Sequence, residues 1–292
     1  MLGVFGLNRI FWMDVRPILL ILERQVTVQP CLVRALMLAR YLHAPLEILY
    51  PAQTIRAGSP EEERRLLTEE SRYLAALQQS IQAPDVSLSV EAANTPLTDA
   101  VITKTRARAY ALVIKTPWHR QSQFTHPTDW QLLQVCAAPL LLTEGRPWRP
   151  QPRFLAAVDL MSEHATVEPR AVLAATTALR QACSAELDLI YVQSEPAPVS
   201  PRMEQLSGEF DVSPTRLHVL PGRPADTLRQ IVAMQGFDLL SVGGPAPSRA
   251  PLAAHQELPV AMALTGVACD LLSVPDSAAY STGSSTGPRP AQ

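Results

Sequence analysis

The chain has 292 residues, a length typical of about two domains, because single hydrophobic cores stop growing near roughly 250–300 residues. Apolar residues make up 47% of it and charged residues 18%, so the chain can bury substantial cores. Its formal net charge of -2 gives no overall attraction to nucleic acid or to anionic lipid, and we expect neither as a partner.

The two ends of the chain are expected to contribute little to the fold. The apolar stretch before Arg9 is too short for a targeting segment, and a native start at Met13 is the simpler interpretation. Residues 277–292 lack apolar periodicity and are predicted to be a disordered tail. No stretch reaches the roughly 20 apolar residues that cross a bilayer, so we expect no membrane span.

The first half alternates patterns typical of strands and helices. Continuous aliphatic runs indicate strands that are covered on both faces, as in a parallel sheet. Ser59, followed by Pro60 and by Glu62 three residues after the serine, is a typical helix start. Strands are predicted at 18–22, 46–50, 86–90, 110–114 and 140–142, and helices at about 31–42, from 60, at 96–108 and at 127–135.

The second half repeats this alternation. Strands are predicted at 153–159, 186–192, 217–220, 237–242 and 270–274, and helices at about 168–183, after 201, at 224–234 and at 257–265. Matching elements follow in the same order at offsets of about 127–141 residues, which indicates a duplicated domain. The alignment places 16–22 opposite 153–159, 45–50 opposite 186–191, 110–114 opposite 237–241, and 136–142 opposite 269–274.

Alternating strands and helices predict an α/β protein with two tandem, doubly wound, five-stranded parallel sheets of Rossmann-like type. In each half the strand order should reverse between the first and fourth strands. We expect a first domain at 14–144, a linker at 145–152, a second domain at 153–276 and the tail beyond. Because the linker is short, the two domains must lie side by side.

Doubly wound sheets bind ligands at the carboxyl ends of the strands where strand order reverses. This rule selects the loops after the first and fourth strands of each half. In the second half these loops carry Asp159 and the segment 242–245, and in the first half Glu23 and the segment 116–119.

Particular residues in these halves resemble the universal stress protein family. The second half contributes Val158-Asp159, the turn at Gly222–Asp226 that opens a helix, and the strand at 237–242 with glycines behind it. The segment 124–133, which contains Pro-Thr-Asp-Trp, together with Arg146-Pro-Trp148, resembles the first half and linker of the tandem bacterial members. The resemblance covers roughly residues 15–275.

The resemblance implies where a nucleotide would bind, because some members of the family bind ATP and others do not. Binders have an aspartate after the first strand, here Asp159, and a loop of the form Gly-x-x-Gly, nine residues, Gly-Ser/Thr after the fourth. The positions that match a binding site are Asp159, Leu160, Val192, Gly222, Gly243 and Gly244.

The phosphate-binding part of that loop is largely absent. Only Gly243 and Gly244 remain, and Glu257, or its neighbours Gln256 and Leu258, stands where the helix-opening glycine belongs. A carboxylate there would repel phosphate. The first half has no glycine between Gly58 and Gly145, so we expect weak ATP binding or none, and no bound cofactor.

Other candidate sites have simpler interpretations. His119, His126, His255 and Glu257 lack a recurring metal-ligand spacing, and surface histidines are commoner. Ser162, Ser241 and Ser248 lack the context of a nucleophilic serine, and Asp129 is interpreted as a helix cap. We therefore predict neither a metal site nor an enzyme.

Four cysteines without CxxC pairs indicate reduced, buried thiols and a cytoplasmic protein. The four cysteines are Cys31, Cys136, Cys183 and Cys269. Cys136 and Cys269 are predicted to be small core residues at equivalent sites just before the last strand of each half.

Two functional hypotheses remain. The first is a non-catalytic stress-response protein with a ligand-sensing or scaffolding role, in which the edge strands 139–142 and 270–274 pair within the chain or between two copies, with Trp130 or Trp148 at the seam. The second is a protein that binds a small molecule with an apolar portion, such as a nucleotide or an acyl compound, in a crevice lined by 250–254 and 118–124. Weak ATP binding through the second domain is a further alternative.

Overall fold

The computed structural model describes residues 16–22, 30–51, 59–81, 83–93, 95–117, 127–160, 167–196, 198–244, 264 and 267–276. The predictions about the start at Met13, the tail at 277–292 and most of the helix at 257–265 lie outside these residues.

The described elements follow the predicted alternation of strands and helices. The first half contains β1 (Ile18–Ile21), α1 (Pro30–Leu42), β2 (Leu46–Pro51), α2 (Pro60–Ser80), β3 (Leu88–Ala93), α3 (Leu97–Ala107), β4 (Leu112–Lys115), α4 (Pro127–Val135) and β5 (Leu140–Leu142). The second contains β6 (Arg153–Ala157), α5 (Pro169–Cys183), β7 (Glu186–Gln193), α6 (Pro201–Glu209), a short 3-10 helix (Pro214–Arg216), β8 (Leu217–Pro221), α7 (Pro224–Gln235), β9 (Leu239–Gly243) and β10 (Asp270–Val274). The Ser59 hydroxyl accepts a hydrogen bond from the Glu62 amide, which confirms the predicted start of α2.

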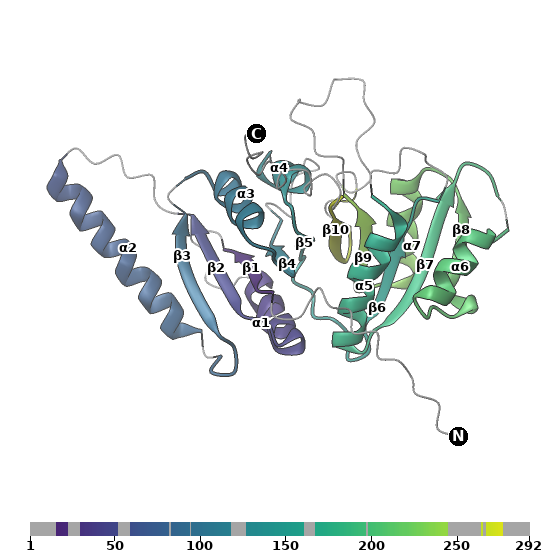
Figure 1. The fold of residues 1–292 in the computed structure, drawn as a ribbon, viewed down its shortest axis with the longest axis horizontal. Helices are drawn as coiled ribbons and strands as arrows, with labels where there is room; N and C mark the ends of the chain where they lie inside the picture. The colour runs from purple at the N-terminus through teal and green to yellow at the C-terminus, as the bar shows by residue number, and fades with distance from the viewer. Residues whose placement is uncertain are drawn as a thin grey trace, which may run out of the picture.

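The ten strands in the described residues form one sheet, in the order β3-β2-β1-β4-β5-β10-β9-β6-β7-β8 (Figure 1). Neighbouring strands are parallel within each half, and the order reverses between β1 and β4 and again between β6 and β9. The predicted pair of five-stranded, doubly wound parallel sheets is therefore confirmed. The two sheets join edge to edge through the antiparallel pair β5–β10.

The strand register corrects the alignment of β1 with β6 by one residue. Ile18 pairs with Leu46 as Phe154 pairs with Leu187, so equivalent positions in these strands lie 136 residues apart rather than 137. The arginines that precede the two strands are consequently not counterparts. With the corrected offset, Glu23 corresponds to Asp159 in sequence.

The equivalence of the two cysteines before the last strands is also wrong, by two residues. Leu140 of β5 and Leu271 of β10 hold equivalent positions, because they pair with Val113 and Leu240. Their role in the core is confirmed, since both thiols are buried. Burial raises the pKa of Cys136 to about 12 and also raises that of Cys269.

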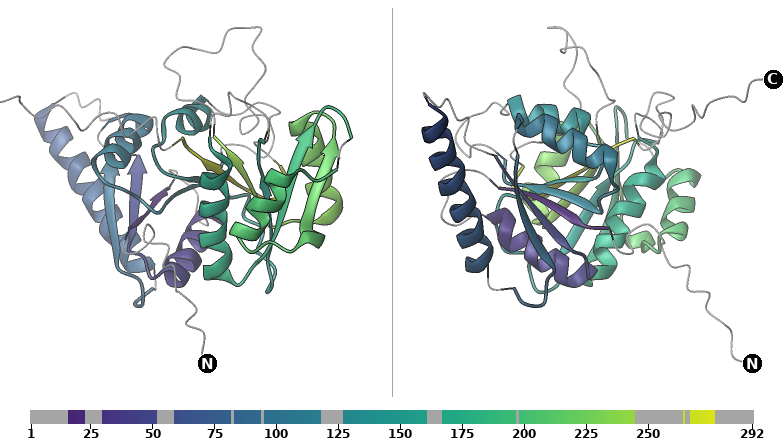
Figure 2. Two further views of the ribbon diagram at one scale, coloured as in Figure 1. Left: turned by 45° about the vertical axis from the view of Figure 1, so that its right-hand side comes forward. Right: turned by 60° about the vertical axis from the view of Figure 1, so that its left-hand side comes forward.

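Helices cover both faces of the sheet, as the turned views in Figure 2 show. On one face, α1, α2, α5 and α6 pack on a core that runs through both halves and includes Ile18 and Phe154. On the other face, α3, α4 and α7 pack on a second core that also spans both halves. None of the helices described here combines the length and apolar character needed to cross a membrane.

A buried polar cluster closes the seam between the halves. Asp270, in β10, accepts hydrogen bonds from the Arg34 Nε at 2.9 Å, the Trp148 Nε1 at 3.0 Å and the Glu144 amide at 3.0 Å. The Arg34 guanidinium lies 3.9 Å from the centre of the Trp148 ring and also donates to the carbonyl oxygen of Arg146. The linker is thus bound to α1 and β10, and the prediction that Trp148 lies at the seam is confirmed.

Trp130 has a different environment. It lies in α4 and packs against the core on the α3, α4 and α7 face, whereas Trp148 packs against the opposite core. Helices α1 and α5 contact each other across the seam, so equivalent helices of the two halves meet there, as in a pair related by an approximate twofold axis.

Candidate functional site

The second half gathers all six predicted site residues at one edge of the sheet. Strands β9, β6, β7 and β8 are neighbours in that order and run parallel, so their carboxyl ends lie side by side. Each of the six lies in or just after the end of one of these strands: Asp159 and Leu160 after β6, Val192 in β7, Gly222 after β8, Gly243 at the end of β9 and Gly244 after it.

The residues after β6 differ in exposure. Asp159 is exposed, Leu160 is buried and Val192 is half-buried. The pKa of Tyr191 is raised by burial and then by the negative charge of Asp159, which places that carboxylate beside the end of β7. A solvent-accessible carboxylate next to apolar side chains is suited to binding a polar group on a partly apolar ligand.

Local geometry favours glycine at these three positions. Gly222 has a φ of 130°, and a Cβ there would lie 2.6 Å from the Thr227 hydroxyl. A Cβ on Gly243 would lie 3.1 Å from the Val167 Cβ, and one on Gly244 would lie 3.0 Å from the carbonyl oxygen of Val274. Close packing explains these glycines without a phosphate group, so they are weak support for nucleotide binding.

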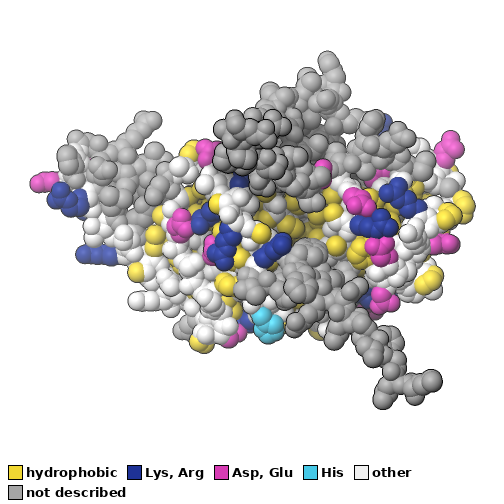
Figure 3. All heavy atoms as spheres, viewed as in Figure 1, with side chains coloured by type: hydrophobic (Ala, Val, Ile, Leu, Met, Phe, Trp, Pro, Cys, Tyr) yellow, Lys and Arg dark blue, Asp and Glu magenta, His cyan; other side chains and the backbone are white. Residues whose placement is uncertain are grey.

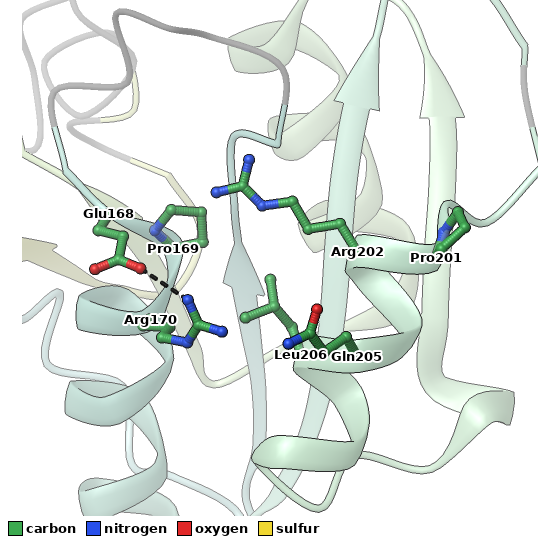
Figure 4. Close-up of a pocket in the computed structure, with 7 residues that line it drawn as sticks. All are labelled: Glu168, Pro169, Arg170, Pro201, Arg202, Gln205 and Leu206. Carbon is green, nitrogen blue, oxygen red and sulfur yellow. Dashed lines mark hydrogen bonds and ion pairs between the residues drawn. The ribbon is translucent and has the colours of Figure 1, made fainter.

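An open hollow of about 360 Å³ lies between the N-terminal ends of α5 and α6 (Figure 4). Its apolar lining comes from Pro169, Pro201 and Leu206. Arg202 lines it as well and donates a hydrogen bond to the carbonyl oxygen of Leu160 at 3.0 Å. The hollow therefore borders the loop that carries Asp159 and Leu160.

The charges around this hollow largely offset one another. Arg170 pairs with Glu168 at 3.1 Å and with Glu209 at 3.0 Å. Figure 3 likewise shows basic and acidic side chains intermixed over this face of the molecule. Sequence reasoning missed the hollow, because it depends on how two helices approach each other.

The corresponding edge of the first half has a different composition. The Nζ of Lys115, the last residue of β4, lies 2.8 Å from a carboxylate oxygen of Asp129, and both side chains are 1% exposed. Asp129 lies in the first turn of α4, where the sequence predicts a helix cap. The amide of Cys31, near the start of α1, donates to the Thr116 hydroxyl at 3.3 Å. Sequence reasoning missed Lys115, although a lysine at the end of a buried aliphatic strand is an unusual signal.

A second charged cluster lies at the opposite, amino-terminal edge of the second half. Asp188 is buried and contacts Arg153 at 2.8 Å, Arg216 at 2.7 Å and His218 at 3.4 Å. Burial favours a higher pKa for Asp188, but hydrogen bonds from His218, Arg216 and Arg153 outweigh it and lower the pKa to about 2. In the aligned position of β2, Glu47 accepts a hydrogen bond from the Tyr110 hydroxyl at 2.6 Å.

The other candidates from the sequence are mostly outside the described residues. Ser241 is described and is fully buried in β9, which does not suit a nucleophile. Within the described part of the chain, no group of three His, Cys, Asp or Glu side chains is placed to hold a metal ion. The residues that remain untested are Glu23, Trp118–Phe124, His119, His126, Ser162, Ser248, Ala250–Ala254, His255, Gln256, Glu257 and Leu258.

Comparison with known proteins identifies the fold. No protein-family model and no curated protein matches the sequence. Among solved structures, a Pseudomonas aeruginosa UCBPP-PA14 protein described as a universal stress protein is 21% identical and aligns over 92% of this chain and 96% of its own, with a TM-score of 0.70. A functionally unknown protein from P. aeruginosa PAO1 is 18% identical and aligns over 92% and 95%, with a TM-score of 0.70.

A universal stress protein from Archaeoglobus fulgidus DSM 4304 is 13% identical and aligns over 88% of this chain and 96% of its own, with a TM-score of 0.61. These alignments extend over both halves. The chain has the tandem universal stress protein fold, with two Rossmann-like α/β units joined in one sheet. The fold expected from the resemblance is confirmed.

Proposed function

We propose that this protein is a non-catalytic, cytoplasmic member of the universal stress protein family with a ligand-sensing or scaffolding role in stress physiology. Its two units correspond to residues 14–144 and 153–276, with 145–152 as linker. The observation that supports this proposal most is the joining of the two units through β5 and β10. With the linker as the covalent connection, this antiparallel pair makes the chain an intramolecular pseudo-dimer.

The way the join is built supports a scaffolding role. Leu141 and Leu272 pair at its centre and are fully buried. The buried Arg34–Asp270 pair then holds α1 of the first unit against β10 of the second. Buried ion pairs add little net stability but disfavour other arrangements. In this proposal the relative placement of the units is fixed, and partners recognise the outer surface of one continuous body.

A second candidate function is the binding of a small molecule with an apolar portion, a nucleotide or an acyl compound. The hollow beside Leu160 supports it, since Pro169, Pro201 and Leu206 offer apolar surface next to Arg202. Asp159 would supply a polar contact at the adjoining strand end. In this candidate Asp159, Leu160, Val192, Gly222, Gly243 and Gly244 form the wall of the site.

Mass spectrometry of the purified, denatured protein distinguishes the two candidates. A stoichiometric co-purified nucleotide or acyl compound would support the binding function and identify the ligand class. Native protein that carries no small molecule, together with no thermal stabilisation by nucleotides or acyl compounds, would support the scaffolding function.

We predict that ATP binds with a dissociation constant above about 100 μM, because the phosphate-binding loop is degenerate and the remaining glycines are explained by packing. Isothermal titration calorimetry with ATP measures this directly. The matched variant is Asp159→Ala, which removes the exposed carboxylate after β6. Low-micromolar binding that is lost in Asp159→Ala would overturn the prediction and favour a nucleotide site in the second unit.

A further inference from the structure

The strands of the join pair as they would in a symmetric dimer. Leu141 of β5 pairs with Leu272 of β10, and Leu142 pairs with Leu271 beside them. Because Leu140 and Leu271 hold equivalent positions in the two halves, Leu141 and Leu272 are also equivalent. A twofold axis through this central pair would produce the same register. The backbone of the join therefore does not by itself decide which halves pair.

The two helices that meet across the seam can be aligned from their ends. His43 follows α1 and Ser184 follows α5, and both have a φ of 51°. In both cases the next residue donates its amide to a helix carbonyl oxygen the same number of positions back. Counting back equally along the two helices, Ala175 of α5 is the counterpart of Arg34 of α1. Both side chains are buried.

The charges at the seam do not follow this symmetry. Arg34 of the first half pairs with Asp270 of the second at 2.9 Å, and their side chains are 6% and 2% exposed. Pro139 is the counterpart of Asp270, because the two residues directly precede the equivalent leucines of β5 and β10. The position related to the ion pair by symmetry is thus occupied by the uncharged residues Ala175 and Pro139.

Only the pairing of unlike halves brings the two charges together. In a join of two first halves, each Arg34 would be buried at Pro139 of the other copy. In a join of two second halves, each Asp270 would be buried at Ala175 of the other copy. Either arrangement buries two charges without partners, which is strongly unfavourable. A buried polar residue that penalises the wrong arrangement sets partner choice in coiled coils in the same way.

We propose that Arg34 and Asp270 determine which halves join, so that the β5 face of the first half accepts a second half and rejects the first half of another copy. The second half of the same chain is the partner that fits. Trp148 of the linker that connects them packs on the Arg34 guanidinium and donates to Asp270. This inference does not depend on the ligand-sensing or scaffolding role, since it concerns only the choice of partner at the join.

The test makes the first half complementary to itself. Pro139→Asp places a carboxylate where Arg34 of another copy would lie in a join of two first halves. Leu141→Cys is the reporter in every variant, because directly opposite residues of an antiparallel pair lie within reach of a disulfide. Only a join of two first halves brings residue 141 of two copies face to face.

Each full-length variant is refolded at high protein concentration under oxidising conditions. The dimer that is linked through residue 141 is then quantified by mass spectrometry. We expect Pro139→Asp to raise its yield roughly tenfold over the reporter alone.

Two control variants carry the same reporter. Pro139→Asn has a similar shape without the charge, and Pro139→Asp/Arg34→Met has the carboxylate without its partner. Both should give as little dimer as the reporter alone. No rise in Pro139→Asp, or an equal rise in either control, overturns the proposal. If the reporter chain does not fold, size exclusion with light scattering compares the same variants without it, and a dimer fraction no higher in Pro139→Asp than in Pro139→Asn counts against the proposal.

Discussion

Asp188 illustrates how a single buried carboxylate contributes to the stability of the second unit. Its pKa is lowered from 3.8 to about 2, with Arg153, Arg216 and His218 in contact. A pKa that is lower in the folded state stabilises the protein at any pH above the unfolded value. That contribution is lost as the pH falls from about 4 through about 2.

We therefore expect Asp188→Asn to lower the free energy of unfolding by about 2 kcal/mol at pH 7. Urea denaturation at a series of pH values measures the difference from the wild type. This difference should be constant above about pH 4 and shrink below it. Asp85→Asn, which removes an exposed pair with Arg40, is the control and should change little. A pH-independent difference for Asp188→Asn would contradict the assignment.

At the scale of elements, the seam depends on one arginine of α1. Burial raises the pKa of Asp270, while the charge of Arg34 acts against that rise. Without Arg34 the carboxylate would remain buried with neutral donors only. Removing one partner of a buried ion pair costs about 3–5 kcal/mol.

Arg34→Met should accordingly lower stability by about 3 kcal/mol at pH 7. Loss of the positive charge should raise the pKa of Asp270 further. A raised pKa in the folded state means that stability is retained at low pH and lost as the pH rises, so the penalty should grow as the pH rises above the ordinary carboxyl range. Denaturation monitored by tryptophan fluorescence measures this. Arg40→Met is the control, because Arg40 lies on the same helix but in an exposed pair with Asp85, and it should show neither effect. If the two variants behaved identically, Arg34 would not hold the seam together.

At the scale of the whole molecule, the antiparallel join covers the strand edges that would otherwise be exposed. Leu141 is fully buried at its centre and pairs with Leu272. A charge there must either stay buried without a partner or open the join. Both outcomes are unfavourable, and the second exposes apolar surface.

Leu141→Asp should cost about 2–4 kcal/mol and promote association between molecules. Thermal unfolding and light scattering after size exclusion measure the two effects. Ser89→Asp, at an exposed position on the outer strand β3, is the matched control for a charge on an edge strand. Unchanged melting and molecular weight for Leu141→Asp would show that the join does not hold the units together.

Much of this architecture could be predicted from the sequence, because aliphatic runs such as Ile18–Ile21 and Leu140–Leu142 fit only strands covered on both faces. The aliphatic edges of the two last strands also indicate that these strands pair with each other, within the chain or between copies. The contacts at the seam and around the hollow could not be predicted in this way. Arg34 and Asp270 are 236 residues apart, and their pairing depends on the packing of the two units against each other. The hollow beside Leu160 likewise depends on the approach of two helices.

The antiparallel join also has a consequence for the order of events during synthesis. Strand β5 ends at Leu142, whereas its partner β10 is complete only at Val274. At about 5–20 residues per second, the roughly 130 residues between them take about 7–26 s to emerge from the ribosome. Throughout that interval the first unit is otherwise complete, but its β5 edge, which β10 covers in the finished molecule, stays open. The nascent chain is therefore most exposed to pairing with a foreign strand in the seconds before its last strand arrives.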